Sequence, residues 1–262
     1  MADDVVGLGH DDLDIADTDA VRSTLERLRP DVVVNTAAFH NVPKCETSPD
    51  VAFSVNAVAP LHLARACTEL GARLVHVSTD YVFDGAKRAP YVEEDRPAPL
   101  NVYGMSKVAG EHAVLADGRH QVVRSSGLYG LRPCRAKGGN FIDTMFRVAG
   151  ERPEVRVVDD EVLTPTFTRD LAAQIRVLAL EGPPGLYHVT AGGACSWYEF
   201  ARAIFDLGGL TTPLAPTSTN GTPGPVRRPS YSVLDNAALA RLGLDRMRPW
   251  RDALADYMQR RQ

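Results

Sequence analysis

Short apolar runs alternate with segments of helical period through the first half of the chain. Continuous runs of this length, rich in valine, are typical of strands buried on both faces of a parallel sheet. They cover residues 31–35, 74–77 and 121–125. Before the first of these runs, Val21, Leu25 and Leu28 fall on one face of a predicted helix. The alternation predicts an α/β fold, a Rossmann-like doubly wound parallel sheet.

The second half is less regular and predicts a smaller α+β cap interleaved with this sheet. We expect a helix after Asn140, another near Thr168, and a strand at residues 185–190 that returns to the main sheet. Residues 211–229 are rich in Pro, Thr, Ser and Gly and predict a loop. The expected core is residues 1–130 plus about 164–190. The expected cap is about residues 131–163 and 191–262.

The stretch 75–111 carries the residues best suited to chemistry. Thr79 follows an apolar run, and Tyr103 and Lys107 stand four residues apart in a predicted helix. That spacing places both side chains on one helical face, with β-carbons about 5–6 Å apart. A neighbouring ammonium favours phenolate, so we expect Lys107 to lower the pKa of Tyr103. These residues predict a carbonyl-reducing site, with Tyr103 as the proton donor and Thr79 orienting the substrate oxygen.

Several segments in order resemble the dTDP-4-dehydrorhamnose reductases of the extended short-chain dehydrogenase/reductase superfamily. They are LDIAD, NTAAF, VNAVAP, STDYVFDG, YGMSK, GGNF, PTFTRDLA, SWYEFA and RRPSYSVLD. The resemblance implies catalytic places for Thr79, Tyr103 and Lys107. It implies NADPH or NADH as the cofactor. The implied reaction is reduction of the C4 carbonyl of a nucleotide-linked 4-keto-6-deoxy sugar, dTDP-4-dehydrorhamnose, to dTDP-rhamnose.

The same resemblance implies further contacts. Asp14 and Ile15 would lie by the adenine. The residues that would line the rest of the cofactor are Ala37, Ala38, Phe39, Ser78, Tyr103 and Lys107. Candidates for the nucleotide-sugar substrate are Asp80, Asn140 and Arg227. For these three an alternative is equally open, because Asp80 suits a turn, Asn140 a helix cap, and Arg227 a solvated pair with Arg228.

The sequence departs from the family at two places. No G-x-x-G-x-x-G turn precedes LDIAD, so the first strand and helix of the sheet are expected to be missing, and residues 5–9 to supply an early strand. Either the true start lies further upstream, or the chain is truncated and cannot hold a dinucleotide tightly. The second departure is Gly127, where related proteins often carry a tryptophan.

Two other functions stay open at this stage. A non-catalytic binding subunit, similar to the regulatory subunit of methionine adenosyltransferase, fits the missing glycine turn but not the intact Thr79, Tyr103 and Lys107. An epimerase or dehydratase of the same superfamily is disfavoured, because dehydratases usually place acidic residues after the threonine and only Asp80 follows here.

The composition of the chain argues against nucleic acid, membranes and metal ions as binding partners. A net charge of −4 gives no basic field for nucleic acid or an anionic membrane, and no apolar run is long enough to span a bilayer. Cys45, Cys67, Cys134 and Cys195 form no C-x-x-C pair, and the histidines show no metal-ligand spacing, so no metal site is expected. Without an export signal the protein is expected to be cytoplasmic, and homodimerisation stays open.

Overall fold

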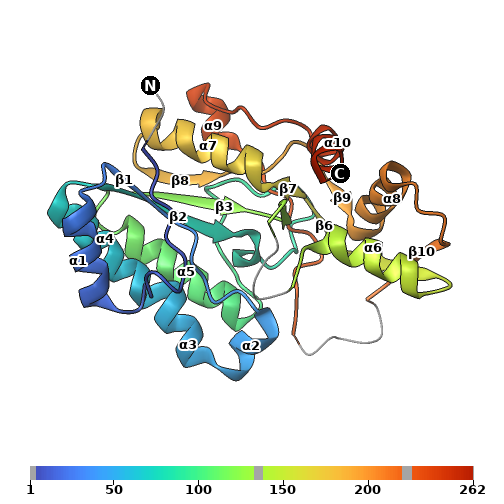
Figure 1. The fold of residues 1–262 in the computed structure, drawn as a ribbon, viewed down its shortest axis with the longest axis horizontal. Helices are drawn as coiled ribbons and strands as arrows, with labels where there is room; N and C mark the ends of the chain where they lie inside the picture. Colours follow the sequence, from blue (N-terminus) through green and yellow to red (C-terminus); the bar gives the residue numbers. More distant parts are fainter. Residues whose placement is uncertain (1–3, 133–137, 220–225, 262) are drawn as a thin grey trace.

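A parallel sheet forms the centre of the molecule (Figure 1). The computed structural model describes residues 4–132, 138–219 and 226–261. Within these ranges the main sheet has the order β1-β2-β3-β8, with all neighbours parallel. The strands are β1 (Val32–Asn35), β2 (Arg73–Thr79), β3 (Gln121–Ser125) and β8 (Gly185–His188). The predicted α/β Rossmann-like class is confirmed.

Helices cover both faces of this sheet (Figure 1). One face carries α1 (Thr18–Leu28), α4 (Ala59–Leu70) and α5 (Val102–Leu115), and the other carries α7 (Thr168–Glu181) and α9 (Ala237–Leu242). Successive strand residues point to opposite faces. Leu74 therefore packs with the α1–α4 layer, whereas its neighbour Val75 packs with α7 and α9. Because alternate residues of each strand pack against apolar layers on opposite faces, the strands are unbroken hydrophobic runs in the sequence.

The segment that leads into α4 changes its helical period. After α2 (Val42–Thr47) and α3 (Pro49–Phe53), residues Ser54–Val58 form a π-helical turn, η1, before α4 begins. Single π-helical turns inside helices occur frequently at functional sites. Here α5 packs directly against η1 at Gly110, where an added β-carbon would collide with the carbonyl oxygen of Asn56. The glycine therefore lets the two helices approach closely.

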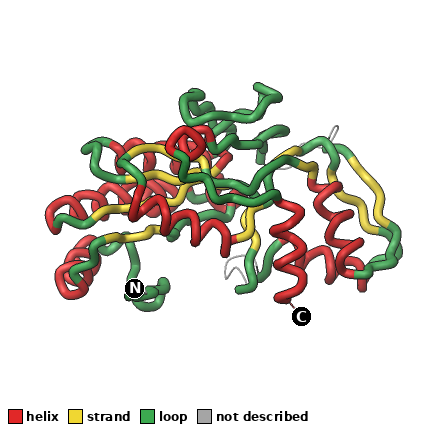
Figure 2. The backbone as a smooth tube through the Cα atoms, turned by 90° about the horizontal axis from the view of Figure 1, so that it is seen from above, coloured by secondary structure: helices red, strands yellow, loops and turns green. Residues whose placement is uncertain are grey.

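The cap lies beyond one end of the main sheet (Figures 1 and 2). Its helices are α6 (Phe141–Glu151), α8 (Trp197–Gly208) and α10 (Trp250–Arg261). Its short strands are β4 (Leu128–Tyr129), β5 (Val155–Val158), β6 (Val162–Leu163), β7 (Thr166–Phe167), β9 (Cys195–Ser196) and β10 (Leu214–Thr217). They pair as β4 with β7, β5 with β10, and β6 with β9. An aromatic cluster around Phe200 fills the interior.

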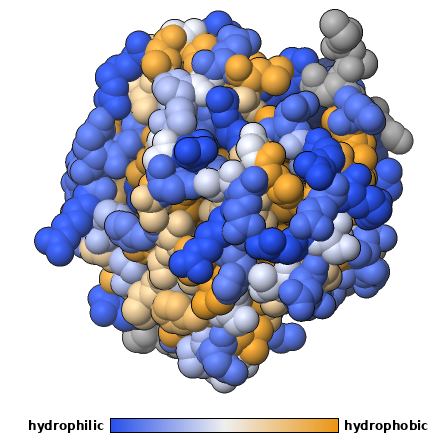
Figure 3. Space-filling model, turned by 90° about the vertical axis from the view of Figure 1, so that its left-hand side faces the viewer, coloured by the Kyte–Doolittle hydropathy of each residue, from blue (hydrophilic) through white to orange (hydrophobic). Residues whose placement is uncertain are grey.

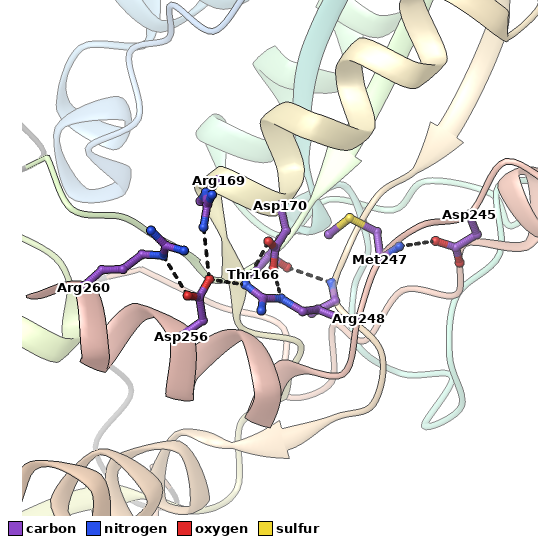
Figure 4. A network of polar contacts seen from close by, with 9 residues as sticks. Thr166, Arg169, Asp170, Asp245, Met247, Arg248, Asp256 and Arg260 are labelled. Carbon is purple, nitrogen blue, oxygen red and sulfur yellow. Dashed lines mark hydrogen bonds and ion pairs between the residues drawn. The ribbon is translucent and has the colours of Figure 1, made fainter.

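A network of charges joins the cap to the main sheet's helices (Figure 4). Arg248 donates from Nε to Oδ2 of Asp170 on α7 at 2.8 Å and from Nη2 to Oδ2 of Asp256 on α10 at 2.7 Å. Arg260 and Arg169 also approach Asp256. The network is partly exposed, so we regard it as an orienting contact between α7 and α10.

Two secondary-structure predictions differ from the structure. Residues 5–9 form no strand, and Val5 is 79% exposed, because a strand forms only where a neighbour satisfies its backbone. Leu214–Thr217 forms β10 although a loop was predicted, since β5 pairs with it. Within the range 191–262 that was assigned to the cap, Ala238 and Leu239 of α9 pack with the core of the main sheet.

The surface mixes apolar and hydrophilic side chains, and three of the cysteines are buried. Figure 3 shows apolar patches among hydrophilic surface on the side that carries α1 and β1. No helix in the described ranges is both long and apolar enough to cross a bilayer. Cys45, Cys67 and Cys195 are buried free thiols, and Cys134 lies outside the described residues.

Candidate active site

The three predicted catalytic residues meet where β2 ends beside the start of α5. Thr79 is the last residue of β2, and Tyr103 and Lys107 lie on the first two turns of α5. The helix begins at Val102, and the Asn101 side chain caps it by accepting from the backbone N–H of Gly104 at 2.9 Å. An added β-carbon at Gly104 would collide with the carbonyl of Tyr81, so this glycine seats the helix on the β2 end.

Tyr103 is half-buried, and Thr79 lies close enough to act on the pKa of its phenol. The Tyr81 ring lies edge-on to it, with ring centroids 5.9 Å apart. Burial raises the pKa of Tyr103 above its usual value, and the Thr79 contact only partly opposes this. The expected lowering of this pKa by Lys107 is not present in this structure, because the lysine points elsewhere. Tyr103 is therefore a protonated phenol at neutral pH.

Lys107 extends beneath the site toward β2. Its side chain is buried, with Nζ 2.8 Å from the carbonyl oxygen of Val77 and 3.0 Å from Nε2 of His76. Burial lowers the pKa of Lys107 to about 8, and the negative charge of Glu111 opposes this. Sequence spacing correctly placed Lys107 on the same helix face as Tyr103 but could not predict the direction of its side chain.

A buried ion pair supports the next turn of α5. Arg124 of β3 donates to both carboxylate oxygens of Glu111, at 2.9 and 2.6 Å. The Ser78 hydroxyl donates to the same carboxylate. Ser78 was predicted to contact the cofactor; the structure buries it and commits its hydroxyl to Glu111.

The loop after β1 is held open by two buried asparagines. Asn35 accepts from the backbone N–H of Ala37 at 3.0 Å. Asn56, in η1, accepts from the N–H of Phe39 at 2.8 Å and donates to its carbonyl at 3.0 Å. Ala37 is thereby left exposed, and Ala38 and Phe39 half-buried. The loop presents small side chains and fixed backbone, which suits the close approach of a flat ligand.

Sequence reasoning missed Asn35, Asn56 and His76. Each is a polar residue inside an apolar or helical run, and each is at most 4% exposed. Burial of a polar side chain is costly without hydrogen bonds, so such residues have partners in native structures. This requirement is the signal that the sequence offered. In VVVN and VHV a polar side chain stands in an otherwise hydrophobic run, so it must have a hydrogen-bond partner in the folded protein.

Asp80 joins three segments. Its carboxylate is 5% exposed and accepts from the hydroxyls of Thr79 at 3.1 Å, Ser126 at 2.8 Å and Ser232 at 2.6 Å. Burial raises the pKa of Asp80, while the three hydroxyls oppose the shift. The predicted substrate contact is therefore occupied by the protein's own hydroxyls, and Asp80 ties the cap-side segment at Ser232 to the end of β2.

The other predicted contacts lie further out. Asn140 caps α6, with Oδ1 accepting from Asp143 N at 3.1 Å and Nδ2 donating to Gly130 O and to the Tyr257 hydroxyl. In the structure Asn140 is thus the N-cap residue of helix α6. Arg227 is exposed, and its backbone carbonyl accepts from Asn101 at 2.9 Å. Asp14 is exposed and Ile15 half-buried, in a turn before α1.

Arg228, beside Arg227, is exposed. Its charge acts on both Tyr81 and Glu161, lowering the pKa of each against the larger effect of burial. Gly127 has φ +56°, and an added β-carbon would lie 2.9 Å from Leu163 Cδ1 and from Pro165 Cα. The backbone at this position therefore favours glycine, and a larger side chain such as tryptophan would be strained here.

A parallel sheet with helices on both faces, and a Thr with a Tyr-x-x-x-Lys pair at the end of β2, defines a short-chain dehydrogenase/reductase fold. A family profile described as the RmlD substrate binding domain matches residues 2–262. The chain belongs to this family, that of the dTDP-4-dehydrorhamnose reductases, as its sequence motifs indicated.

Individual relatives agree over most of their length. The spore coat polysaccharide biosynthesis protein SpsK of Bacillus subtilis (strain 168) is 40% identical over 98% of this chain and 89% of that protein. A dTDP-4-dehydrorhamnose reductase of Streptomyces griseus is 42% identical over 96% and 84%. The crystal structure of dTDP-4-dehydrorhamnose reductase from Bacillus anthracis str. Ames in complex with NADP superposes with a TM-score of 0.91 at 35% identity, covering 97% and 89%.

Proposed function

We propose that this protein catalyses the NAD(P)H-dependent reduction of the C4 carbonyl of a nucleotide-linked 4-keto-6-deoxy sugar, converting dTDP-4-dehydrorhamnose to dTDP-rhamnose. The observation that carries the proposal is the meeting of Thr79 at the end of β2 with Tyr103 on the first turn of α5, with Lys107 on the next turn directly below. Relatives named for this reaction at about 40% identity support the choice of substrate.

In this proposal Tyr103 is the general acid. Its raised pKa keeps the phenol protonated at neutral pH, so a proton is available for the alkoxide that forms on the sugar. Thr79 orients the carbonyl oxygen beside the phenol by turning its hydroxyl proton from Asp80 toward that oxygen when substrate binds. Proton donation and orientation thus come from neighbouring hydroxyls on β2 and α5.

The loop after β1 suits a dinucleotide. Ala37 and Ala38 carry no side-chain atom beyond Cβ, and Asn35 and Asn56 hold their backbone in place. We propose that Ala37–Phe39 and Lys107 hold the cofactor, with Asp14 and Ile15 beside the adenine. When bound, NADPH or NADH supplies the hydride for the carbonyl carbon.

The substrate's diphosphate requires cations at the mouth of the site. We assign this role to Arg227 and Arg228. Both are exposed, and they lie directly after residue 226, the first residue of the last described range. Arginine binds phosphate oxygens through paired N–H donors, which also fixes the orientation of the ligand.

The test is NADPH oxidation with dTDP-4-dehydrorhamnose by the purified protein and its Tyr103→Phe variant. Loss of the acid is expected to lower kcat by about 10²–10⁴-fold, the usual contribution of general acid catalysis. Tyr198→Phe, which removes a hydroxyl from α8 in the cap, is the matched control and should retain activity. Equal turnover by Tyr103→Phe and the parent would overturn the role of Tyr103. Absence of turnover in the parent, with dinucleotide binding intact, would favour a non-catalytic binding subunit.

A further inference from the structure

His76 lies buried between the amide of Asn35 and the amine of Lys107. Its Nδ1 is 3.0 Å from Nδ2 of Asn35, and its Nε2 is 3.0 Å from Nζ of Lys107. The ring is fully buried, and burial together with the Lys107 charge lowers its pKa well below the usual value. His76 is therefore a neutral imidazole, with one ring nitrogen carrying a proton and the other accepting one.

The Asn35 amide determines which nitrogen carries the proton. Its Oδ1 faces the backbone N–H of Ala37, a group that can only donate, so the oxygen cannot be exchanged with Nδ2. Nδ2 is thus fixed toward His76, and an amide nitrogen can only donate. Nδ1 of His76 must accept this hydrogen bond, and the ring proton is on Nε2.

This tautomer sets a condition on Lys107. The Nε2–H group points at Nζ, so the contact is a hydrogen bond only if Nζ offers a lone pair. A lone pair exists on the uncharged amine and is absent from the ammonium form. The same amine donates to the carbonyl of Val77 at 2.8 Å. The observed geometry therefore belongs to uncharged Lys107, accepting from β2 at one residue and donating to it at the next.

We propose that His76 is a positioning residue for Lys107, in which the tautomer fixed by Asn35 holds the uncharged amine against β2 and offers no acceptor to the ammonium form. The inference rests on the proposed function, because it concerns the lysine of that site. On protonation Lys107 would present only donors to Nε2–H, so the contact to His76 would be lost and the side chain released from it.

The surrounding charges place this change near neutral pH. The carboxylate that acts on Lys107 is Glu111, one turn along α5, and Arg124 of β3 and Ser78 of β2 already engage it. Burial outweighs Glu111 and brings the pKa of Lys107 to about 8. Both states of the lysine are thus accessible under ordinary conditions, and His76 distinguishes them.

The first measurement is the imidazole ¹⁵N spectrum of the full chain near pH 9, with His76 assigned by its disappearance in His76→Gln. We expect Nδ1 to resonate as an unprotonated nitrogen and Nε2 as a protonated one. An Nδ1–H tautomer, or two protonated nitrogens, would overturn the proposal. This reading needs neither cofactor nor substrate, so it stands apart from the test of reductase activity.

The second measurement follows the Lys107 side chain by ¹³C-lysine NMR during a pH titration, with Lys107→Met for assignment. Asn35→Asp keeps an oxygen toward Ala37 but replaces the donor facing Nδ1 with an acceptor, which reverses the His76 tautomer. Nε2 then accepts from the ammonium, and the midpoint of Lys107 should rise by about one pH unit or more. The pH profile of NADPH oxidation should move by the same amount.

Asn140→Asp is the matched control, because it adds the same charge at the cap of α6, away from His76. Its Lys107 midpoint should equal that of the parent. Equal midpoints in the parent and Asn35→Asp would overturn the proposal. If the tautomer and midpoints agree with expectation while no variant oxidises NADPH, the positioning role stands and the proposed reaction fails.

Discussion

The end of the sheet beneath the site and the interior of the cap are buried to a similar degree but by opposite chemistry. Beneath the site the buried residues are largely polar, and their hydrogen bonds run between β1, β2, β3 and α5. In the cap, Phe200 packs against the rings of Tyr129, Phe141 and Trp250. The contrast teaches that the core supplies directed groups for chemistry, whereas the cap supplies a shape held by apolar packing.

The largest effect is expected at the ion pair below α5, where the dependence of the core on polar contacts can be tested directly. Arg124→Met should destabilise the fold by about 3–5 kcal/mol, since it leaves the Glu111 carboxylate buried without its cation. The measurement is urea unfolding at neutral pH. The double variant Arg124→Met with Glu111→Leu should recover most of the loss, because no charge is then left unpaired. A double variant no more stable than the single one would show that the site does not depend on charge pairing.

Acid should affect the sheet before the cap. The pKa of His188 falls to about 3, through burial first and the Arg124 charge second, against 6.5 in the unfolded chain. Below pH 6.5 His188 therefore binds a proton in the unfolded chain but not in the folded chain. The folded state loses stability as the pH falls from 6.5 toward 3. The loss approaches about 1.4 kcal/mol per pH unit for one such histidine.

In the cap, Asp256 begins to lose its charge in more acidic solution than the pH at which the unfolded His188 first takes up a proton. The pKa of Asp256 lies below its usual 3.8 because Arg248 and Arg260 bind the carboxylate, so its stabilisation is lost only in stronger acid. Hydrogen exchange at pH 7 and pH 5 should show reduced protection in β2, β3 and β8 first. Simultaneous loss in α6 and α10 would contradict the ordering.

The smallest expected effect is at the start of α6. Asn140→Ala removes the side-chain cap and should cost about 1 kcal/mol in thermal unfolding. Asn140→Asp retains an oxygen for the Asp143 N–H and should lose less. A loss in Asn140→Ala as large as that of Arg124→Met would mean that the cap depends on polar contacts as strongly as the site does.

Much of this architecture could be predicted from the sequence, because the strands of the main sheet carry apolar residues on both of their faces. Residues 31–35, 74–77, 121–125 and 185–190 all contain strands of the sheet. The i, i+4 spacing also brought Tyr103 and Lys107 to one helix face. These properties depend on local periodicity, which a sequence displays directly.

The remainder depends on partners distant in sequence. β10 forms because β5 pairs with it, and residues 5–9 form no strand because nothing in the described structure pairs with them. The direction of Lys107 depends on His76, which in turn depends on Asn35. A chain of three polar residues on three elements has no signature in the spacing of any one of them.

The Asp80 carboxylate has a consequence for the order in which the protein matures. Two of its three hydroxyl donors, Ser126 and Ser232, lie 46 and 152 residues further along the chain. Domains fold during synthesis from the N-terminal side as the ribosome releases the chain. The sheet can therefore assemble early around an incompletely bonded buried carboxylate, and the end of β2 reaches its final form only after Ser232 has emerged. A nascent chain stopped before that residue would contain Thr79, Tyr103 and Lys107 but not a finished site.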